Sequence, residues 1–302
     1  MRATLAVGAA VALAIGVAGC GQDHSESQQH GTPSVVASTD VWGSVASAVT
    51  GDHAAVKSIV TSAVDDPHSF EVSPADAATI SDASLMVYNG GGYDHWVDDV
   101  LSSHQGVPAV NAYSLLPAGL PKPANEHVFY DLETAKAVAN QIAEKLGQID
   151  SAHADDYKAN AATFGEQADT IATAERAIGA GHPGASVVAT EPVAHYLLLS
   201  MGVADKTPPG FASAAEEGDD PAPADVAAVL DLINTHQVSA LVVNRQTESP
   251  VTKQITDAAR QASVPIIEVT ETLPQGQNYL EWQRKTVDDV ARQLDIAAQA
   301  NR

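Results

Sequence analysis

Short β-like runs alternate with amphipathic helical patterns along most of the chain, and this alternation constrains the fold more than any other feature. The β-like runs are rich in valine and other apolar residues, whereas the helical segments repeat apolar positions every three or four residues. Strands that alternate with helices form parallel sheets covered by helices on both faces. The sequence therefore predicts an α/β fold. The predicted strands cover 34–38, 56–60, 85–88, 110–112, 186–189, 240–243 and 265–269, and the predicted shorter helices cover 41–49, 74–80, 96–101, 132–146, 193–201, 226–236, 250–262 and 279–299.

One predicted helix is longer than the others and divides the chain. It runs from about 152 to 178, with apolar residues such as Tyr157, Phe164 and Ile171 at helical spacing. At roughly 1.5 Å per residue it would extend for about 40 Å. A continuous helix of this kind resists hinge bending, so we expect limited motion between the parts that it joins. The predicted parts are an N-terminal lobe (34–150), a rigid linking helix (151–179) and a C-terminal lobe (180–302), each lobe with its own parallel sheet.

The N-terminus has the pattern of a secretory signal peptide. Arg2 precedes an uncharged apolar stretch at 3–17, which is shorter than the roughly 20 apolar residues of a membrane span. Small residues then lead into Cys20, the only cysteine, as lipoprotein processing requires. We predict a signal peptide at 1–19, lipidation at Cys20 and a flexible tether at 20–33, with an uncleaved anchor helix as the alternative. The protein would then be held at the extracytoplasmic face of the cell membrane.

The amino-acid composition limits which molecules the protein can bind and how its fold can be stabilised. The formal net charge is −23, which argues against nucleic acid and anionic membrane surfaces as partners and favours the approach of cations. A single cysteine excludes a disulfide framework, so the exported fold depends on its own core. Residues 213–225 are acidic and contain prolines, and we predict that they form a loop.

Four side chains of the kinds that bind metals are candidate ligands, and they are spread over both predicted lobes. Ligands of open α/β sheets bind at the carboxyl ends of the strands, so His, Asp and Glu residues at these places are candidates. His68 follows the second strand, with Asp66 as a candidate outer partner of its imidazole. His127 precedes a long helix, and Glu271 follows the last strand. Each of these histidines and carboxylates has a plain alternative as a surface-loop residue.

The fourth candidate, Glu191, directly follows the strand at 186–189. A carboxylate there can also serve as a helix cap through the helix dipole. His195 lies four residues further on, a spacing that places both side chains on one face of a helix. This spacing alone is a weak indication of a metal site.

Motifs of the common enzyme classes are missing from the sequence. There is no Gly-x-Ser-x-Gly nucleophile elbow and no His-Glu-x-x-His pair. The glycines at 90–92 lack the later glycine of a dinucleotide-binding loop and the Gly-Lys-Ser/Thr of a phosphate-binding loop, so a structural turn is the better interpretation.

Three segments of the chain stand out together: DPHSFE at 66–71, YNGGGYD at 88–94 and DPAP at 220–223. They resemble, in this order, the first-ligand motif, the glycine turn, and the acidic loop and helix start of the second lobe in one known family. That family is the metal-specific solute-binding lipoproteins of bacterial ABC transporters for zinc and manganese. The resemblance extends nearly end to end from residue 34, and it implies that both lobes bind one metal ion and that the long helix is the rigid backbone between them.

The resemblance also implies a set of four metal ligands. His68 and His127 match the two histidines of the first lobe, although this chain has Asn-Glu-His at 125–127 where the family usually has Asn-Pro-His. Glu191 matches the third ligand, and Glu271 falls where the family usually has aspartate. The fourth assignment is therefore the least secure. The fallback carboxylates are Asp205, Glu248 and Glu268.

Two imidazoles and two carboxylates suit Mn²⁺, Zn²⁺ and Fe²⁺. Carboxylates favour harder ions, whereas raw affinity favours Zn²⁺ over Mn²⁺. We therefore expect the site to bind Mn²⁺, with Zn²⁺ almost as strong a candidate. The resemblance implies a monomer that delivers the ion to the membrane permease of an ABC importer and is not an enzyme. A metal-dependent hydrolase and a metal-binding surface adhesin without a transporter stay open as alternatives.

Overall fold

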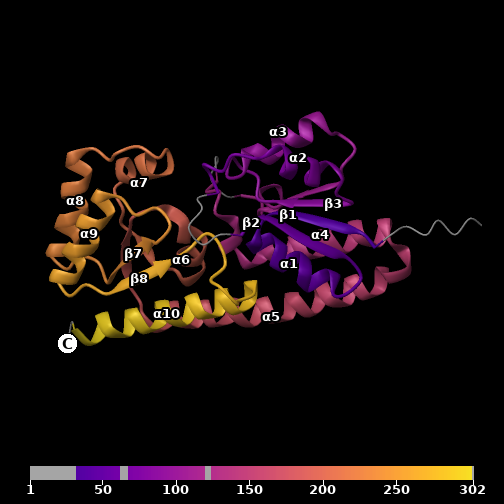
Figure 1. Cartoon of the computed structure of the whole chain (residues 1–302). Helices are drawn as coiled ribbons and strands as arrows, with labels where there is room; N and C mark the ends of the chain where they lie inside the picture. Colours follow the sequence, from indigo (N-terminus) through magenta and orange to yellow (C-terminus); the bar gives the residue numbers. More distant parts are fainter. Residues whose placement is uncertain (1–31, 62–66, 120–123, 301–302) are drawn as a thin grey trace, which may run out of the picture. The chain divides into compact units, whose positions relative to one another are not determined.

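The computed structural model describes residues 32–61, 67–119 and 124–300. The chain from Thr32 onward forms one compact unit (Figure 1). The predicted signal peptide, the lipidated Cys20, most of the tether and Asp66 lie outside the described residues. Within residues 32–61, 67–119 and 124–300, no helix is both long and apolar enough to cross a membrane.

Two separate four-stranded sheets, both entirely parallel, organise the fold. The first has the strand order β2-β1-β3-β4, and the second has the order β6-β5-β7-β8. Their central strands are almost fully buried because helices cover both faces, which is why they read as apolar runs. The strands are β1 (Ser34–Thr39), β2 (Ala55–Val60), β3 (Leu85–Tyr88), β4 (Ala109–Asn111), β5 (Ser186–Ala189), β6 (Ala204–Asp205), β7 (Ala240–Asn244) and β8 (Ile266–Val269).

Helices connect the parallel strands, as the sequence predicts. The described residues also include four 3₁₀ turns, three between β4 and β5 and one between β5 and β6. The α-helices are α1 (Asp40–Thr50), α2 (Pro74–Ser81), α3 (His95–Ser103), α4 (Leu132–Ile149), α5 (Ala154–Gly181), α6 (His195–Met201), α7 (Pro209–Glu216), α8 (Pro223–Asn234), α9 (Pro250–Gln261) and α10 (Tyr279–Ala300). The 3₁₀ turns are η1 (Tyr113–Leu115), η2 (Val128–Tyr130), η3 (Ser151–His153) and η4 (Pro192–Ala194).

The 28-residue helix α5 joins the parts of the molecule that surround the two sheets (Figure 1). It packs on α1 and α4 beside the first sheet, where Asn160 donates to the Val49 carbonyl at 3.0 Å. Further along it packs on α6 and α10. The buried side chains of α5 include Tyr157, Phe164 and Ile171, at the spacing seen in the sequence. The prediction of two parallel-sheet lobes joined by one long helix is confirmed.

The predicted loop at 213–225 is only partly correct. Helix α7 extends to Glu216 and helix α8 begins at Pro223, so only residues 217–222 lie outside a helix. Both helices have proline at their first position, where its missing N–H costs no hydrogen bond. The buried ring of Phe211 anchors α7 to the core of the second sheet.

The segment that follows β8 is hydrogen-bonded to residues near the first sheet. The Tyr130 hydroxyl donates to the Thr270 carbonyl at 3.0 Å, and the Leu273 N–H donates to the Asp40 carboxylate at 3.1 Å. On α10, the Tyr279 hydroxyl donates to the Phe129 carbonyl at 2.7 Å. Contacts with residues near the first sheet therefore fix the position of this segment.

A buried carboxyl group, Glu175, faces α6 from the C-terminal part of α5. Its exposure is 2%, and the Ser200 hydroxyl donates to its Oε2. Burial raises the pKa of Glu175 from 4.5 to about 7, although the hydrogen bond from Ser200 opposes the rise. The folded chain therefore holds this proton at pH values at which the unfolded chain has released it.

We expect the substitution Glu175→Gln to reduce the loss of stability as pH rises. A carboxyl whose folded pKa is raised contributes its full stability below pH 4.5 and loses it as pH rises through about 7, a difference of about 3 kcal/mol. Glutamine keeps an acceptor for Ser200 but has no charge to bury. Urea unfolding at pH 4.5 and pH 8 measures the effect. Equal pH dependence in Glu175→Gln and in Glu166→Gln, on an exposed position of the same helix, would contradict it.

Candidate metal centre

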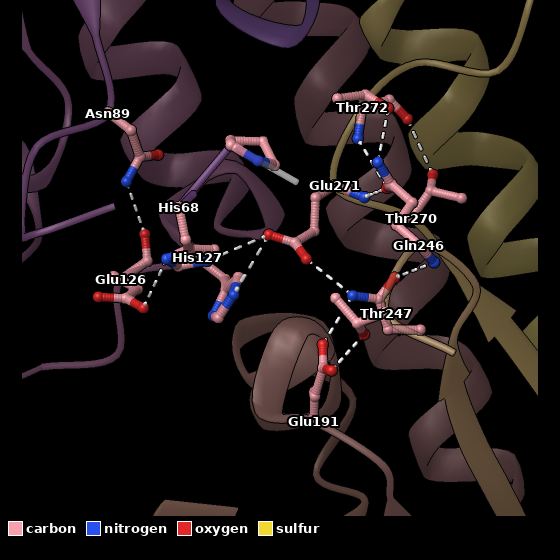
Figure 2. Close-up of polar contacts among 12 residues, drawn as sticks. His68, Asn89, Glu126, His127, Glu191, Gln246, Thr247, Thr270, Glu271 and Thr272 are labelled. Carbon is pink, nitrogen blue, oxygen red and sulfur yellow. Dashed lines mark hydrogen bonds and ion pairs between the residues drawn. The ribbon is translucent and has the colours of Figure 1, made fainter. Parts of the chain in front are cut away.

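The polar residues at the carboxyl ends of the strands meet in one cavity of about 420 Å³. His68 lies in the loop after β2, and His127 immediately precedes η2, which leads into α4. Glu191 follows β5 by two residues, and Glu271 follows β8 by two residues. All four line the cavity, so residues from both sheets face the same space, as the strand-end rule predicts (Figure 2).

Glu271 lies at the centre of this group. Its side chain is 1% exposed, and its Oε2 faces the Nε2 atoms of His68 at 3.4 Å and His127 at 3.6 Å (Figure 2). Among the described residues, Oε2 accepts no hydrogen bond. Burial opposes ionisation, but the contacts with His127 and His68 outweigh it and hold the pKa of Glu271 below its ordinary value. This carboxylate is therefore a negative charge aimed at two imidazole nitrogens.

The two histidines present the same ring nitrogen to Glu271 and the other nitrogen to an outer partner. Nδ1 of His127 lies 3.1 Å from Oδ1 of Asn125, and Nδ1 of His68 lies 3.5 Å from Oε1 of Glu126. An acceptor beside Nδ1 retains a proton there, so Nε2 is the nitrogen that would give up its proton and bind a metal ion. Both imidazoles are thus oriented with a potential ligand atom directed into the cavity.

The side chain of Asn244, at the end of β7, connects the two carboxylates of the second sheet. Its Nδ2 donates to Oε2 of Glu191 and to Oε1 of Glu271, each at 2.7 Å. The Thr247 hydroxyl donates to the second oxygen of Glu191. Burial raises the pKa of Glu191, although the hydrogen bonds from Thr247 and Asn244 oppose the rise. One amide group therefore holds two like-charged side chains beside each other.

The structure contradicts one local prediction about Glu191. The backbone of Glu191 is extended, with φ −154° and ψ 154°, and it precedes η4 and α6 instead of lying within a helix. It therefore does not share a helical face with His195, which is exposed at the start of α6. The fallback carboxylates Asp205, Glu248 and Glu268 are all exposed and do not line the cavity.

Sequence reasoning missed Glu126, Asn244 and Thr247. Asn244 stands at the carboxyl end of a buried strand, the position that nominated the other candidates, but a search for His, Asp and Glu passes over an amide. Thr247 lies three residues beyond it in an irregular segment. Glu126 adjoins His127, and single atoms of His68, Glu126 and His127 lie within 4.8 Å of one another. A charged residue beside a loop histidine is common, so only the fold shows that its side chain enters the cavity.

This arrangement has the donor atoms of a divalent metal site. Imidazole nitrogen and carboxylate oxygen are ligands for Zn²⁺, Mn²⁺ and Fe²⁺, and a cation among these groups would relieve the repulsion between Glu191 and Glu271. Exposed Glu217, Asp219 and Asp220, between α7 and α8, also line this cavity. Their negative charge favours the approach of cations to the cavity.

Comparisons with known proteins place the chain among metal-uptake proteins. The family described as zinc-uptake complex component A, periplasmic, matches residues 35–293. The manganese-binding lipoprotein MntA of Bacillus subtilis is 24% identical over 252 residues, which cover 80% of this chain and 81% of that protein. MntA of Halalkalibacterium halodurans is 26% identical over 157 residues, which cover 50% of this chain and about half (52%) of that protein.

Solved structures share the fold. The laminin-binding protein Lmb of Streptococcus agalactiae, described as having adhesin and metal-transporting activity, superposes with a TM-score of 0.74. It is 24% identical, and the match covers 87% of this chain and 99% of that chain. At this identity the likeness establishes the architecture, namely two parallel-sheet lobes and a long connecting helix.

We expect Asn244→Asp to destabilise the metal-free chain by about 2–3 kcal/mol at pH 7, because the variant places a third carboxylate between two others and removes their shared donor. Urea unfolding in the presence of a chelator measures this loss. The matched control is Asn234→Asp, at an exposed position near the end of α8. An equal loss in both variants would show that Asn244 does not hold the carboxylates together.

Proposed function

Because the chain belongs to the family of periplasmic zinc-uptake component A proteins, we propose that it captures a divalent transition metal outside the cytoplasmic membrane and delivers it to an ABC importer. The observation that carries this proposal is the convergence of two imidazole Nε2 atoms on one buried carboxylate oxygen of Glu271. The ion is the cargo, and the proposed ligands are His68, His127, Glu191 and Glu271.

The ligand set supports Mn²⁺ and Zn²⁺ as the principal candidates. Two neutral imidazoles and two carboxylates contain no thiolate, and the carboxylates favour harder ions such as Mn²⁺. The curated relatives described above are manganese-binding lipoproteins, whereas the family as a whole is described by zinc uptake. We propose Mn²⁺ with a slight preference over Zn²⁺, and Fe²⁺ as a third cargo.

Delivery requires the protein to remain near a membrane permease. We propose that lipidated Cys20 anchors it at the extracytoplasmic face of the cell membrane and that residues 20–33 form the tether. The two relatives named above are themselves lipoproteins. The proposed unit is a monomer with metal-binding lobes at 34–150 and 180–302. The helix at 151–179 joins them, and the permease would contact the lobes around the cavity.

The alternatives differ in what they require of the site. A hydrolase keeps one metal position open for water and places a general base beside it. Here both oxygens of Glu191 accept hydrogen bonds and Oε2 of Glu271 faces the two histidines, which favours binding over turnover. An adhesin function has specific support in the likeness to Lmb, and it is compatible with metal transport. Loss of metal uptake when the chain is deleted distinguishes a transporter component from an adhesin alone.

Competition of Mn²⁺, Zn²⁺ and Fe²⁺ for the purified, metal-free chain tests the proposal directly. We expect one ion per chain and a loss of affinity of more than about 100-fold in His68→Ala and in Glu191→Ala, since even outer-shell changes cost about 10- to 100-fold. The matched controls are His104→Ala, at the end of α3, and Glu268→Ala, on β8, both at exposed positions. Parent-like binding by His68→Ala and Glu191→Ala would refute the proposed site, and chelator-sensitive turnover of esters or peptides would favour the hydrolase.

A further inference from the structure

Glu126 lies in the cavity beside His68, although nothing in the proposed ligand set requires it. Its side chain is 21% exposed, and its Oε1 lies 3.5 Å from Nδ1 of His68 (Figure 2). The Nε2 atom of the same ring faces Glu271 at 3.4 Å. The imidazole of His68 therefore lies between two carboxylates, one at each ring nitrogen.

A buried network of hydrogen bonds from residues of the first lobe fixes the backbone of Glu126. Its carbonyl accepts from Nδ2 of Asn89 at 2.8 Å. The Asn89 side chain in turn accepts from the indole N–H of Trp42 at 3.2 Å. The fully buried carboxylate of Asp94 accepts from the N–H groups of Asn89 and Gly90, each at 2.7 Å. This network gives Glu126 a defined place, as an orienting residue requires.

The glycine turn after β3 leaves room for the carboxylate. A Cβ atom at Gly92, which has a φ of +101°, would lie 3.6 Å from Oε2 of Glu126. A larger side chain at this position would compete with Glu126 for the same space. The turn therefore holds the Glu126 backbone through Asn89 and also leaves space for its side chain.

We propose that Glu126 is a positioning residue that holds His68 in the tautomer and orientation needed to bind the captured metal through Nε2. The inference rests on the proposed metal-capture function. An imidazole binds a metal through the nitrogen that lacks a proton, and a carboxylate at Nδ1 retains the proton there and raises the basicity of Nε2. His127 has a neutral amide, Asn125, in the corresponding place. The two histidines are therefore oriented by partners of different charge.

Glu126 also changes the charge of the site. With Glu191 and Glu271 it places three carboxylates around two neutral imidazoles, so a bound divalent ion would leave one negative charge in excess. The excess charge favours retention of the cation. Glu126 thus supplies an orienting group from the same segment that carries His127.

Binding measurements and NMR together test the role of Glu126. We expect Glu126→Ala to weaken Zn²⁺ and Mn²⁺ binding by about 10- to 100-fold, the range for carboxylates that orient metal-bound histidines. Glu126→Gln keeps an acceptor oxygen and should lose less. The control is Glu144→Gln, which removes a charge from an exposed position on α4 and should bind as the parent does. Imidazole ¹⁵N shifts of His68 in the metal-free chain should show a proton on Nδ1 in the parent and loss of that proton in Glu126→Ala, where Glu271 at Nε2 is the remaining carboxylate partner.

Several results would overturn this assignment. Binding by Glu126→Ala that is no weaker than binding by Glu144→Gln would refute it, as would unchanged His68 shifts in Glu126→Ala. A Zn²⁺-loaded parent in which His68 binds through Nδ1 would also refute it. The variant His68→Ala distinguishes failure of the proposed metal-capture function from failure of the orienting role of Glu126. If that variant binds as the parent does, the proposed function itself fails, whereas its failure to bind beside an unaffected Glu126→Ala would reject only the orienting role.

Discussion

The buried charge of Glu271 is the constraint on which the rest of the site depends. A carboxylate with 1% exposure is costly unless other groups compensate its charge and satisfy its oxygens. The imidazoles of His68 and His127 face one oxygen, and the Asn244 amide donates to the other. These partners come from both sheets, so the charge can be accommodated only when the two halves of the molecule are correctly placed relative to each other.

The segment that carries Glu271 is correspondingly well fixed. The Thr270 carbonyl accepts from Tyr130, and the Leu273 N–H donates to Asp40, so residues near the first sheet hold both ends. From the second sheet, Oε1 of Gln246 accepts the Glu271 N–H at 2.5 Å. Glu191 is held by Thr247 and by Asn244. Asn244 also donates to Glu271, so its side chain fixes the positions of the two carboxylates relative to each other.

The sequence predicts the fold well because the central strands and α5 have strong local patterns. It fails where the pattern is short or ambiguous: β6 has two residues, and α7 begins with Pro209 and Gly210, which resemble loop residues. Strand-end position nominates His68, Glu191 and Glu271, whereas the family resemblance is needed to join these three with His127 into one predicted site. The neighbours that orient them could not be predicted, because Glu126, Asn244 and Thr247 are recognisable only by where their side chains point in three dimensions. The spacing of Glu191 and His195 misled because a helix starts between them.

The hydrogen bonds around the cavity join residues that are very distant along the chain. Tyr130 and Thr270 are separated by 140 positions, and Asp40 and Leu273 by 233. Contacts of such separation require large loops to close, which costs chain entropy, and they need both distant segments to be present and in place. A nascent or partly folded chain therefore has histidines and carboxylates but no cavity in which they meet. An ion bound in this geometry therefore indicates that the polypeptide has completed its folding. A chain that is still being synthesised would not bind metal at this place.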